Sequence, residues 1–270
     1  MQFAFGRFDF YNCKEPPKGI LKICNVSKSV IEGRNVFTLS PKNQISSTQI
    51  LYLHGGAYVQ NFVKQHWSFL AMLVKETNCT VTAPDYPLAP EYTHQDVFSM
   101  LVPLCKQILS VEAENTILMG DSAGGGLALA LAQKIKLEEL PSPGQLILLS
   151  PWLDITLTNP AITEIDRLDP FLSVKGLRRA GAAYAGRSDP NDFMTSPITG
   201  DLDEIGEISI FVGTRDILVA DARKLYYRAK ERGIFVNYRE YPDMVHVWMF
   251  LSFPEARLAQ QEIFDLIRAN

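Results

Sequence analysis

The stretch TILMGDSAGGGLALALA, residues 116–132, decides which fold this chain adopts. Residues 116–119 form a short apolar run typical of a buried strand, and an Ala/Leu-rich run typical of a buried helix follows the glycines. The motif Gly120-Asp121-Ser122-Ala123-Gly124 lies between them with the spacing G-x-S-x-G, which in this context predicts a sharp turn that exposes the Ser122 hydroxyl as a candidate nucleophile. The alternative is a Gly-rich helix start or a phosphate-binding turn, but no P-loop Gly-Lys-Ser/Thr is present.

Short apolar runs on both sides of this stretch predict a mostly parallel sheet with helices on both faces. Amphipathic segments at residues 219–232 and 254–269 predict two of the helices. Residues 20–27 and 35–39 flank a turn at Glu32-Gly33-Arg34 and predict an opening antiparallel hairpin. The remaining strands are predicted at residues 50–53, 80–83, 116–119, 146–149, 208–212 and 236–241.

One connection breaks this alternation, because residues 153–203 separate two predicted strands by about 50 residues, far beyond the usual connection of about 2 to 6. We therefore expect a single α/β domain over residues 1–270, with 153–203 inserted as a lid or pocket wall.

Composition narrows the classes of protein. The 270 residues are 47% apolar and 21% charged, with a net charge of −4 and dispersed basic residues, which indicates neither a nucleic-acid partner nor stable membrane association. No apolar stretch approaches the roughly 20 residues of a membrane span, and residues 1–12 lack the apolar centre of a signal peptide. The four cysteines are widely spaced without a C-x-x-C pair, so we expect buried thiols in a reduced, cytoplasmic setting rather than a thiol nucleophile.

A second Gly-rich motif, His54-Gly55-Gly56-Ala57, directly follows the predicted strand 50–53. Such a loop turns backbone N–H groups toward a substrate carbonyl. We predict an oxyanion hole built from Gly55, Gly56 or Ala57 together with the N–H of Ala123, with His54 as an anchor of the loop.

A serine nucleophile needs a base and an acid that orients it. Of four histidines, only His246 follows the last predicted strand and precedes the last helix, which predicts it as the base; His66 and His94 precede the nucleophile. Asp216 ends the turn after the strand 208–212 and is the predicted acid. Asp221, inside the next helix, and Asp243, three residues from His246, are its rivals.

These motifs resemble those of the hormone-sensitive-lipase-like esterases, a family within the α/β-hydrolases. The likeness runs from about residue 50 to the C-terminus, with two departures: Ala57 stands where the family usually has a third glycine, and Pro87 where it has an arginine. Four stretches carry it: His54-Gly55-Gly56-Ala57-Tyr58, Asp85-Tyr86-Pro87-Leu88-Ala89-Pro90-Glu91, Gly120-Asp121-Ser122-Ala123-Gly124-Gly125 and Ser150-Pro151-Trp152-Leu153-Asp154.

The resemblance implies an α/β-hydrolase fold and a carboxylesterase that hydrolyses small, short-chain esters through an acyl-enzyme. It implies no organic cofactor, and no residue cluster has metal-ligand spacing. An amidase such as an arylformamidase, with the same triad, is the first alternative; a non-catalytic ligand receptor on this fold is the second, although such receptors lose the base and His246 is present. We expect a small-molecule ester as partner, and base rates favour a homodimer.

Overall fold

The computed structural model describes residues 12–270. Residues 1–11, which carry most of the segment interpreted as lacking a secretory signal, lie outside the described residues. Within the described part, no helix combines the length and the apolar character that a membrane crossing needs.

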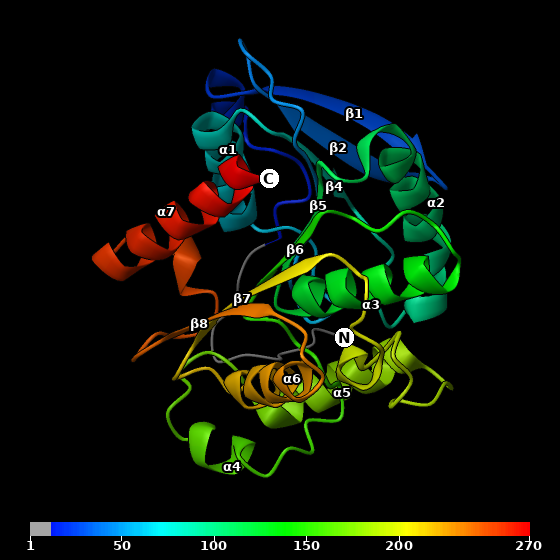
Figure 1. The fold of residues 1–270 in the computed structure, drawn as a ribbon, viewed down its shortest axis with the longest axis vertical. Coiled ribbons are helices and arrows are strands. Elements are labelled where there is room, and N and C mark those ends of the chain that lie inside the picture. The colour runs from blue at the N-terminus through cyan, green and yellow to red at the C-terminus, as the bar shows by residue number, and fades with distance from the viewer. Residues whose placement is uncertain (1–11) are drawn as a thin grey trace.

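Within residues 12–270, eight strands form one twisted sheet in the order β1-β2-β4-β3-β5-β6-β7-β8 (Figure 1). β1 and β2 pair antiparallel, as do β2 and β4, and every later pair is parallel. This arrangement confirms the α/β-hydrolase fold expected from the motifs. The strands are β1 Asn25–Ile31, β2 Arg34–Ser40, β3 Gln49–Leu53, β4 Thr80–Pro84, β5 Thr116–Asp121, β6 Gln145–Leu149, β7 Glu207–Gly213 and β8 Val236–Tyr241.

The predicted hairpin forms, but its first strand was placed too early. Lys18–Lys22 is a 3₁₀ helix, and β1 begins only at Asn25 and continues to Ile31. The apolar residues of 20–24 are the cause of the error, since Ile20 and Cys24 are buried as part of the core while β1 itself is largely exposed. An edge strand that faces water shows little hydrophobic pattern.

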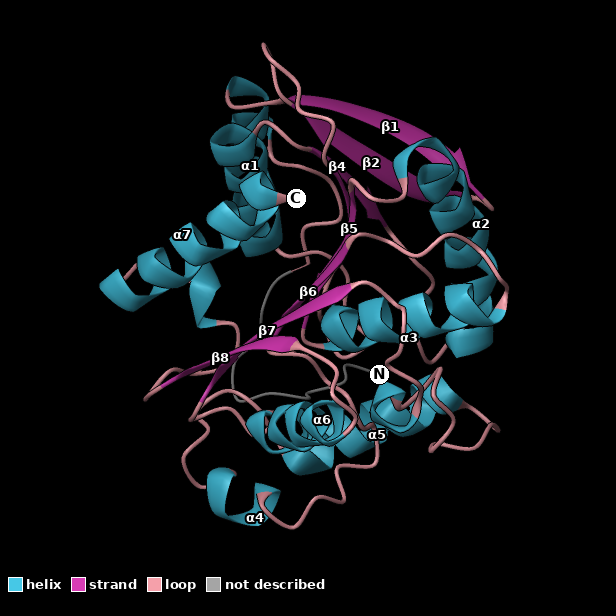
Figure 2. Ribbon diagram, viewed as in Figure 1, coloured by secondary structure: helices cyan, strands magenta, loops and turns pink. Residues whose placement is uncertain are grey.

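Helices cover both faces of the sheet (Figure 2). α1 and α7 pack against each other on one face, and α2, α3 and α6 lie on the other. The predictions for residues 219–232 and 254–269 match α6 and α7 to within one residue. The helices are α1 Lys64–Thr77, α2 His94–Glu112, α3 Ala123–Leu137, α4 Ile162–Ile165, α5 Val174–Ala185, α6 Val219–Glu231 and α7 Pro254–Ala269.

The sheet separates two cores. Successive side chains of a strand point to opposite faces, so Leu146 and Leu148 of β6 join the core beneath α3, while Ile147 and Leu149 join the core beneath α1 and α7. Every residue of β5 and β6 is buried, as expected for central parallel strands covered on both sides. Because both faces of β5 and β6 are packed, these strands and their carboxyl ends are held in place.

Residues 153–203 connect β6 to β7 and contain α4, α5 and a short 3₁₀ turn at Pro197–Thr199. α5 is amphipathic and buries Leu177 and Tyr184. The Tyr184 ring stacks on that of Tyr58, with 3.7 Å between ring centroids, so the β6–β7 connection packs directly on the loop that follows β3.

Truncating a central strand residue will test this two-sided core. Leu148 is 0% exposed, so Leu148→Ala leaves a cavity and should lower the free energy of unfolding by about 2 to 5 kcal/mol. Leu258→Ala on α7, where the side chain is 62% exposed, should change it by less than about 0.5 kcal/mol. Urea unfolding followed by circular dichroism measures both, and equal losses would contradict the assigned burial.

Candidate active site

Ser122 occupies the sharp turn between β5 and α3. Its backbone is strained, with φ of 54° and ψ of −120°, a combination that most residues avoid. Its N–H donates to the Leu149 carbonyl oxygen (2.8 Å), and its own carbonyl accepts the N–H of Trp152 (2.8 Å). A side chain at Gly124 would overlap the Leu53 carbonyl of β3. Glycine is therefore required for the turn to pack against the neighbouring strand.

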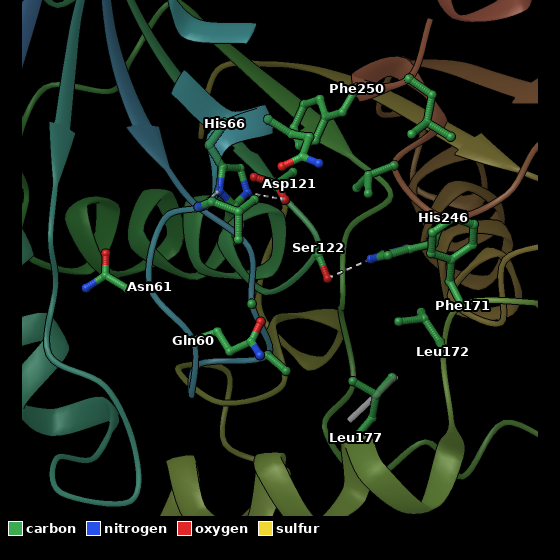
Figure 3. Close-up of a pocket in the computed structure, with 16 residues that line it drawn as sticks. Gln60, Asn61, His66, Asp121, Ser122, Phe171, Leu172, Leu177, His246 and Phe250 are labelled. Carbon is green, nitrogen blue, oxygen red and sulfur yellow. Dashed lines mark hydrogen bonds and ion pairs between the residues drawn. The ribbon is translucent and has the colours of Figure 1, made fainter. Parts of the chain in front are cut away.

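His246 lies in the loop after β8, and the loop after β7 holds that loop in place. The Thr214 N–H donates to the Tyr241 carbonyl (3.0 Å), and the Arg215 N–H donates to the Met244 carbonyl (2.9 Å). The two loops thus form one unit at the carboxyl ends of adjacent strands. As a result, His246 Nε2 lies 2.9 Å from Ser122 Oγ (Figure 3).

Asp216 completes the arrangement. Its Oδ2 lies 2.8 Å from His246 Nδ1, and its Oδ1 accepts the Leu218 N–H (2.9 Å). Because a carboxylate only accepts, Nδ1 carries the proton and Nε2 accepts the Ser122 hydroxyl proton. The structure therefore brings together the three residues predicted as nucleophile, base and acid.

The two rival carboxylates are engaged elsewhere. Asp221 lies in the first turn of α6 and accepts a hydrogen bond from Asn159 Nδ2 (2.9 Å). Asp243 is exposed and forms an ion pair with Arg215 (3.0 Å). Neither is among the described partners of His246.

Burial and charge act on His246 in opposite directions. Burial alone would lower the pKa of the imidazole, but the neighbouring charge of Asp216, its hydrogen bond, and the charges of Asp169 and Asp121 outweigh burial and raise the pKa of His246 above 6.5. A base with a raised pKa holds the proton from Ser122 more strongly, and it loses its acceptor form as the pH falls through that pKa.

The loop after β3 supplies backbone donors, although not all of the predicted ones. The Gly55 N–H donates to Asp121 Oδ1 (2.9 Å) and is occupied. Gly56 and Ala57 line the pocket, and no described residue accepts the N–H of either. Ala123 is the first residue of α3, so its N–H has no partner within the helix. The donors that remain are those of Gly56, Ala57 and Ala123.

Asp121 is a functional neighbour that the sequence reasoning missed. It is buried beside Ser122, and Tyr52 donates its hydroxyl to Oδ1 (2.6 Å) while His66 Nε2 lies 3.3 Å from Oδ2. The Val63 N–H donates to His66 Nδ1 (3.0 Å), so Nε2 carries the proton and donates to the carboxylate. Burial raises the pKa of the Asp121 carboxyl, but His66 and the donated hydrogen bonds lower it overall. The motif contained this carboxylate, but its partners on β3 and α1 are distant in sequence.

His54 lies at the end of β3 as the predicted loop anchor. Its ring stacks on that of Tyr86 (4.3 Å between centroids), its Nδ1 lies 2.7 Å from the Gly55 carbonyl oxygen, and Tyr86 donates its hydroxyl to the His54 carbonyl (2.5 Å). Burial lowers the pKa of His54 to about 3, so the ring stays neutral. His94 is the first residue of α2.

Arg34, which the sequence analysis did not identify, holds the segment after β4 that packs on His54 through Tyr86. From β2 it donates to Asp85 Oδ1 (3.1 Å) and to the carbonyls of Asp85 and Tyr86 (2.8 and 3.0 Å). Pro87 stands where the hormone-sensitive-lipase-like esterases usually have an arginine. In this chain, the guanidinium of Arg34 binds residues 85 and 86, directly before Pro87.

A pocket opens beside Ser122 (Figure 3). His66 and Gln60 flank it on one side, and the apolar side chains of Leu172 and Leu177, from the insertion, flank it on the other. Its lining residues are Gly56, Ala57, Gln60, Asn61, Val63, Gln65, His66, Asp121, Ser122, Phe171, Leu172, Leu177, His246, Val247, Phe250 and Leu251.

Among the described residues, neither a possible metal cluster nor a cysteine lines this pocket. Within residues 12–270, no group of three or more His, Cys, Asp or Glu side chains could hold a metal ion. Cys24, Cys79 and Cys105 are buried and Cys13 is half-buried, and all four are free. Burial raises the pKa of the Cys79 thiol to about 11, which opposes formation of a thiolate.

Comparison with known proteins agrees with this fold. A family model described as α/β hydrolase fold matches residues 50–250. An esterase of Acinetobacter venetianus is 31% identical over 231 residues, covering 83% of this chain and 76% of the relative. An acetyl-hydrolase of Streptomyces hygroscopicus is 31% identical over 214 residues, covering 78% and 72%.

Solved structures give the same result. An esterase/lipase from an uncultured bacterium superimposes with a TM-score of 0.85 at 28% identity, covering 93% of this chain and 89% of that one. An esterase from the bacterial hormone-sensitive lipase family gives a TM-score of 0.86 at 28% identity, covering 92% and 84%.

The balance of charge around His246 can be measured directly. In the wild type, NMR titration of the His246 imidazole should give a pKa above 6.5. Asp216→Asn removes the largest charge that opposes burial, so the pKa of His246 should fall relative to the wild type. A value that does not change in the variant would show that Asp216 does not set the basicity of the imidazole.

Proposed function

Because the chain belongs to the α/β-hydrolase fold family and is similar to hormone-sensitive-lipase-like esterases, we propose that it is a serine carboxylesterase acting on small esters with short acyl chains. The observation that carries this proposal is the continuous hydrogen-bonded chain Ser122–His246–Asp216, with heavy-atom distances of 2.9 and 2.8 Å.

The proposed reaction has two halves. Ser122 Oγ attacks the ester carbonyl carbon while His246 Nε2 takes the hydroxyl proton; the tetrahedral intermediate then collapses, and His246 returns the proton to the departing alcohol. Water repeats the sequence on the acyl-enzyme and releases the acid. Asp216 keeps the proton on Nδ1 and stabilises the imidazolium that forms in each half.

The N–H groups of Gly56, Ala57 and Ala123 are the proposed oxyanion hole. Each such donor stabilises the tetrahedral oxyanion by roughly 3 kcal/mol relative to its absence. Asp121 supports the oxyanion hole indirectly. It accepts the Gly55 N–H, and this hydrogen bond keeps in place the turn that carries Gly56 and Ala57. No step needs a metal or an organic cofactor.

Residues 153–203 act in this proposal as a cap that forms the pocket wall. Phe171, Leu172 and Leu177 come from this segment and line the pocket beside Ser122. A wall of this kind favours apolar groups of limited size. A short acyl chain also fits the name of the relative from Streptomyces hygroscopicus, an acetyl-hydrolase.

Amide hydrolysis and non-catalytic ligand binding are the two alternative functions. Amide hydrolysis uses the same triad, and the ester is preferred because the similar proteins are esterases. A non-catalytic receptor would have lost its base, whereas His246 is bonded to both Ser122 and Asp216. A homodimer and a cytoplasmic location stay predictions from the sequence.

A series of p-nitrophenyl esters from acetate to palmitate tests the proposed function. Turnover should peak at short acyl chains, and Ser122→Ala should lower kcat by at least about 10⁴-fold because the nucleophile is lost. An aryl formamide measured beside the esters should be the poorer substrate. A folded wild type that turns over no ester would refute the proposal, and preferential cleavage of the formamide would favour the amidase.

The role of the insertion can be tested separately. Leu172→Ala and Leu177→Ala should each lower kcat/KM for the butyrate ester relative to the acetate ester, by up to about fourfold for each methylene that loses its contact, at about 0.8 kcal/mol per buried CH₂. Leu168→Ala is the matched control, because Leu168 belongs to the same segment but is 58% exposed and lies outside the pocket. An unchanged butyrate-to-acetate ratio in both pocket variants would show that the insertion is not the wall for the acyl chain.

A further inference from the structure

We propose that Asp169 is a positioning residue of this site, which ties the pocket wall to the loop of the catalytic acid and adds a second buried carboxylate that stabilises the protonated base. The proposal rests on the proposed function for its kinetic consequences. Neither the motifs nor the similarity to known proteins pointed to this residue.

Asp169 is buried, and backbone N–H groups bind both oxygens of its carboxylate. The residue lies in the insertion, just after α4, and its side chain is 0% exposed. One carboxylate oxygen, Oδ1, accepts the N–H groups of both Phe171 (2.7 Å) and Leu172 (2.9 Å). The other oxygen, Oδ2, accepts the N–H of Ile217 (2.9 Å). Three backbone donors thus satisfy a carboxylate that is removed from water.

These three bonds join two functional parts of the molecule. Phe171 and Leu172 line the pocket, whereas Ile217 directly follows Asp216 in the loop after β7. The next residue, Leu218, donates its N–H to Asp216 itself (2.9 Å). A displacement of the pocket wall is therefore transmitted through Asp169 to the loop that holds the catalytic acid.

Asp169 also acts through its charge. The carboxylates that act on His246 are Asp216 from the β7–α6 loop, Asp169 from the insertion and Asp121 from β5. No Lys or Arg among the described residues forms an ion pair with Asp169 or Asp216, so His246, once it is protonated, is the cation that balances their charges. The imidazolium formed when Ser122 attacks is stabilised by this second carboxylate.

The pKa of Asp169 agrees with this arrangement. Burial and then the charge of Asp216 raise the pKa of the Asp169 carboxyl, while the hydrogen bonds from Leu172 and Ile217 and the charge of His246 lower it in part. A carboxylate that only closed a turn would gain nothing from the charge of a second buried carboxylate, which raises its pKa. The repulsion between two buried carboxylates costs stability, and that cost falls when His246 is protonated during the reaction.

The test compares Asp169→Asn with Asp221→Asn. Asp169→Asn should move the acid limb of the kcat/KM profile to lower pH by roughly half a unit to one unit, because one of the charges raising the pKa of His246 is lost. The plateau of kcat should fall by up to about tenfold, because the imidazolium is less stabilised. Asp169→Ser, whose hydroxyl can still accept from the following turn, should show the same direction of shift.

Asp221→Asn is the matched control, since Asp221 is a buried carboxylate on the adjoining helix that does not act on His246. The acid limb of the kcat/KM profile of Asp221→Asn should lie at the same pH as that of the wild type. A merely structural role of Asp169 would lower the plateau without moving the limb, and that result, or an equal shift in Asp221→Asn, would overturn the proposal.

A measurement on the wild type covers the case in which the Asp169 variants do not fold. The amide protons of Phe171 and Leu172, which Asp169 accepts, should shift in NMR spectra with the same apparent pKa as the His246 imidazole. Amides that do not respond to this titration would overturn the coupling. Because this readout needs no turnover, a protein that hydrolyses no ester would refute the proposed function and leave the role of Asp169 to be decided by the titration.

Discussion

The close approach of the turn at Ser122 to the end of β3 is the constraint on which the rest of the site depends. The backbone of Gly124 lies against the Leu53 carbonyl, where even a methyl group would overlap it. This contact holds Ser122 at a positive φ of 54°, a conformation that costs of order 1 to 3 kcal/mol in a non-glycine residue. The packed core on both sides of β5 compensates for that strain, so the hydroxyl is presented by a rigid part of the molecule.

Parallel pairing then brings the other groups to the same place. Gly56 and Ala57 follow β3, Ser122 follows β5, Asp216 follows β7 and His246 follows β8, and the carboxyl ends of these four parallel strands lie at the same end of the sheet. Each loop is held by its neighbour: Asp121 fixes the Gly55 N–H, and the backbone of Arg215 fixes that of Met244. Groups from four loops that are spread between residues 54 and 246 of the sequence therefore form one site.

Buried negative charge gives the site its electrostatic character. Asp216, Asp169 and Asp121 are all withdrawn from water and all act on His246. Unpaired buried carboxylates are costly, and here each is stabilised by backbone N–H groups or by uncharged side-chain donors. The three carboxylates are stabilised best when the His246 imidazole is protonated. In the proposed reaction, this state forms when Ser122 attacks.

The sequence by itself determined the fold, the three residues of the hydrogen-bonded chain and most of the strands, because glycine spacing and short apolar runs between turns are local signals. It misplaced β1, because an exposed edge strand has no apolar pattern, and it included Gly55 among the donors, because the acceptor of that N–H, Asp121, is distant in the chain. Only the tertiary structure decided the partners of Asp121, the support by Arg34 and the place of Asp169. Those depend on which segments meet, and contacts between residues far apart in sequence leave no local pattern to interpret.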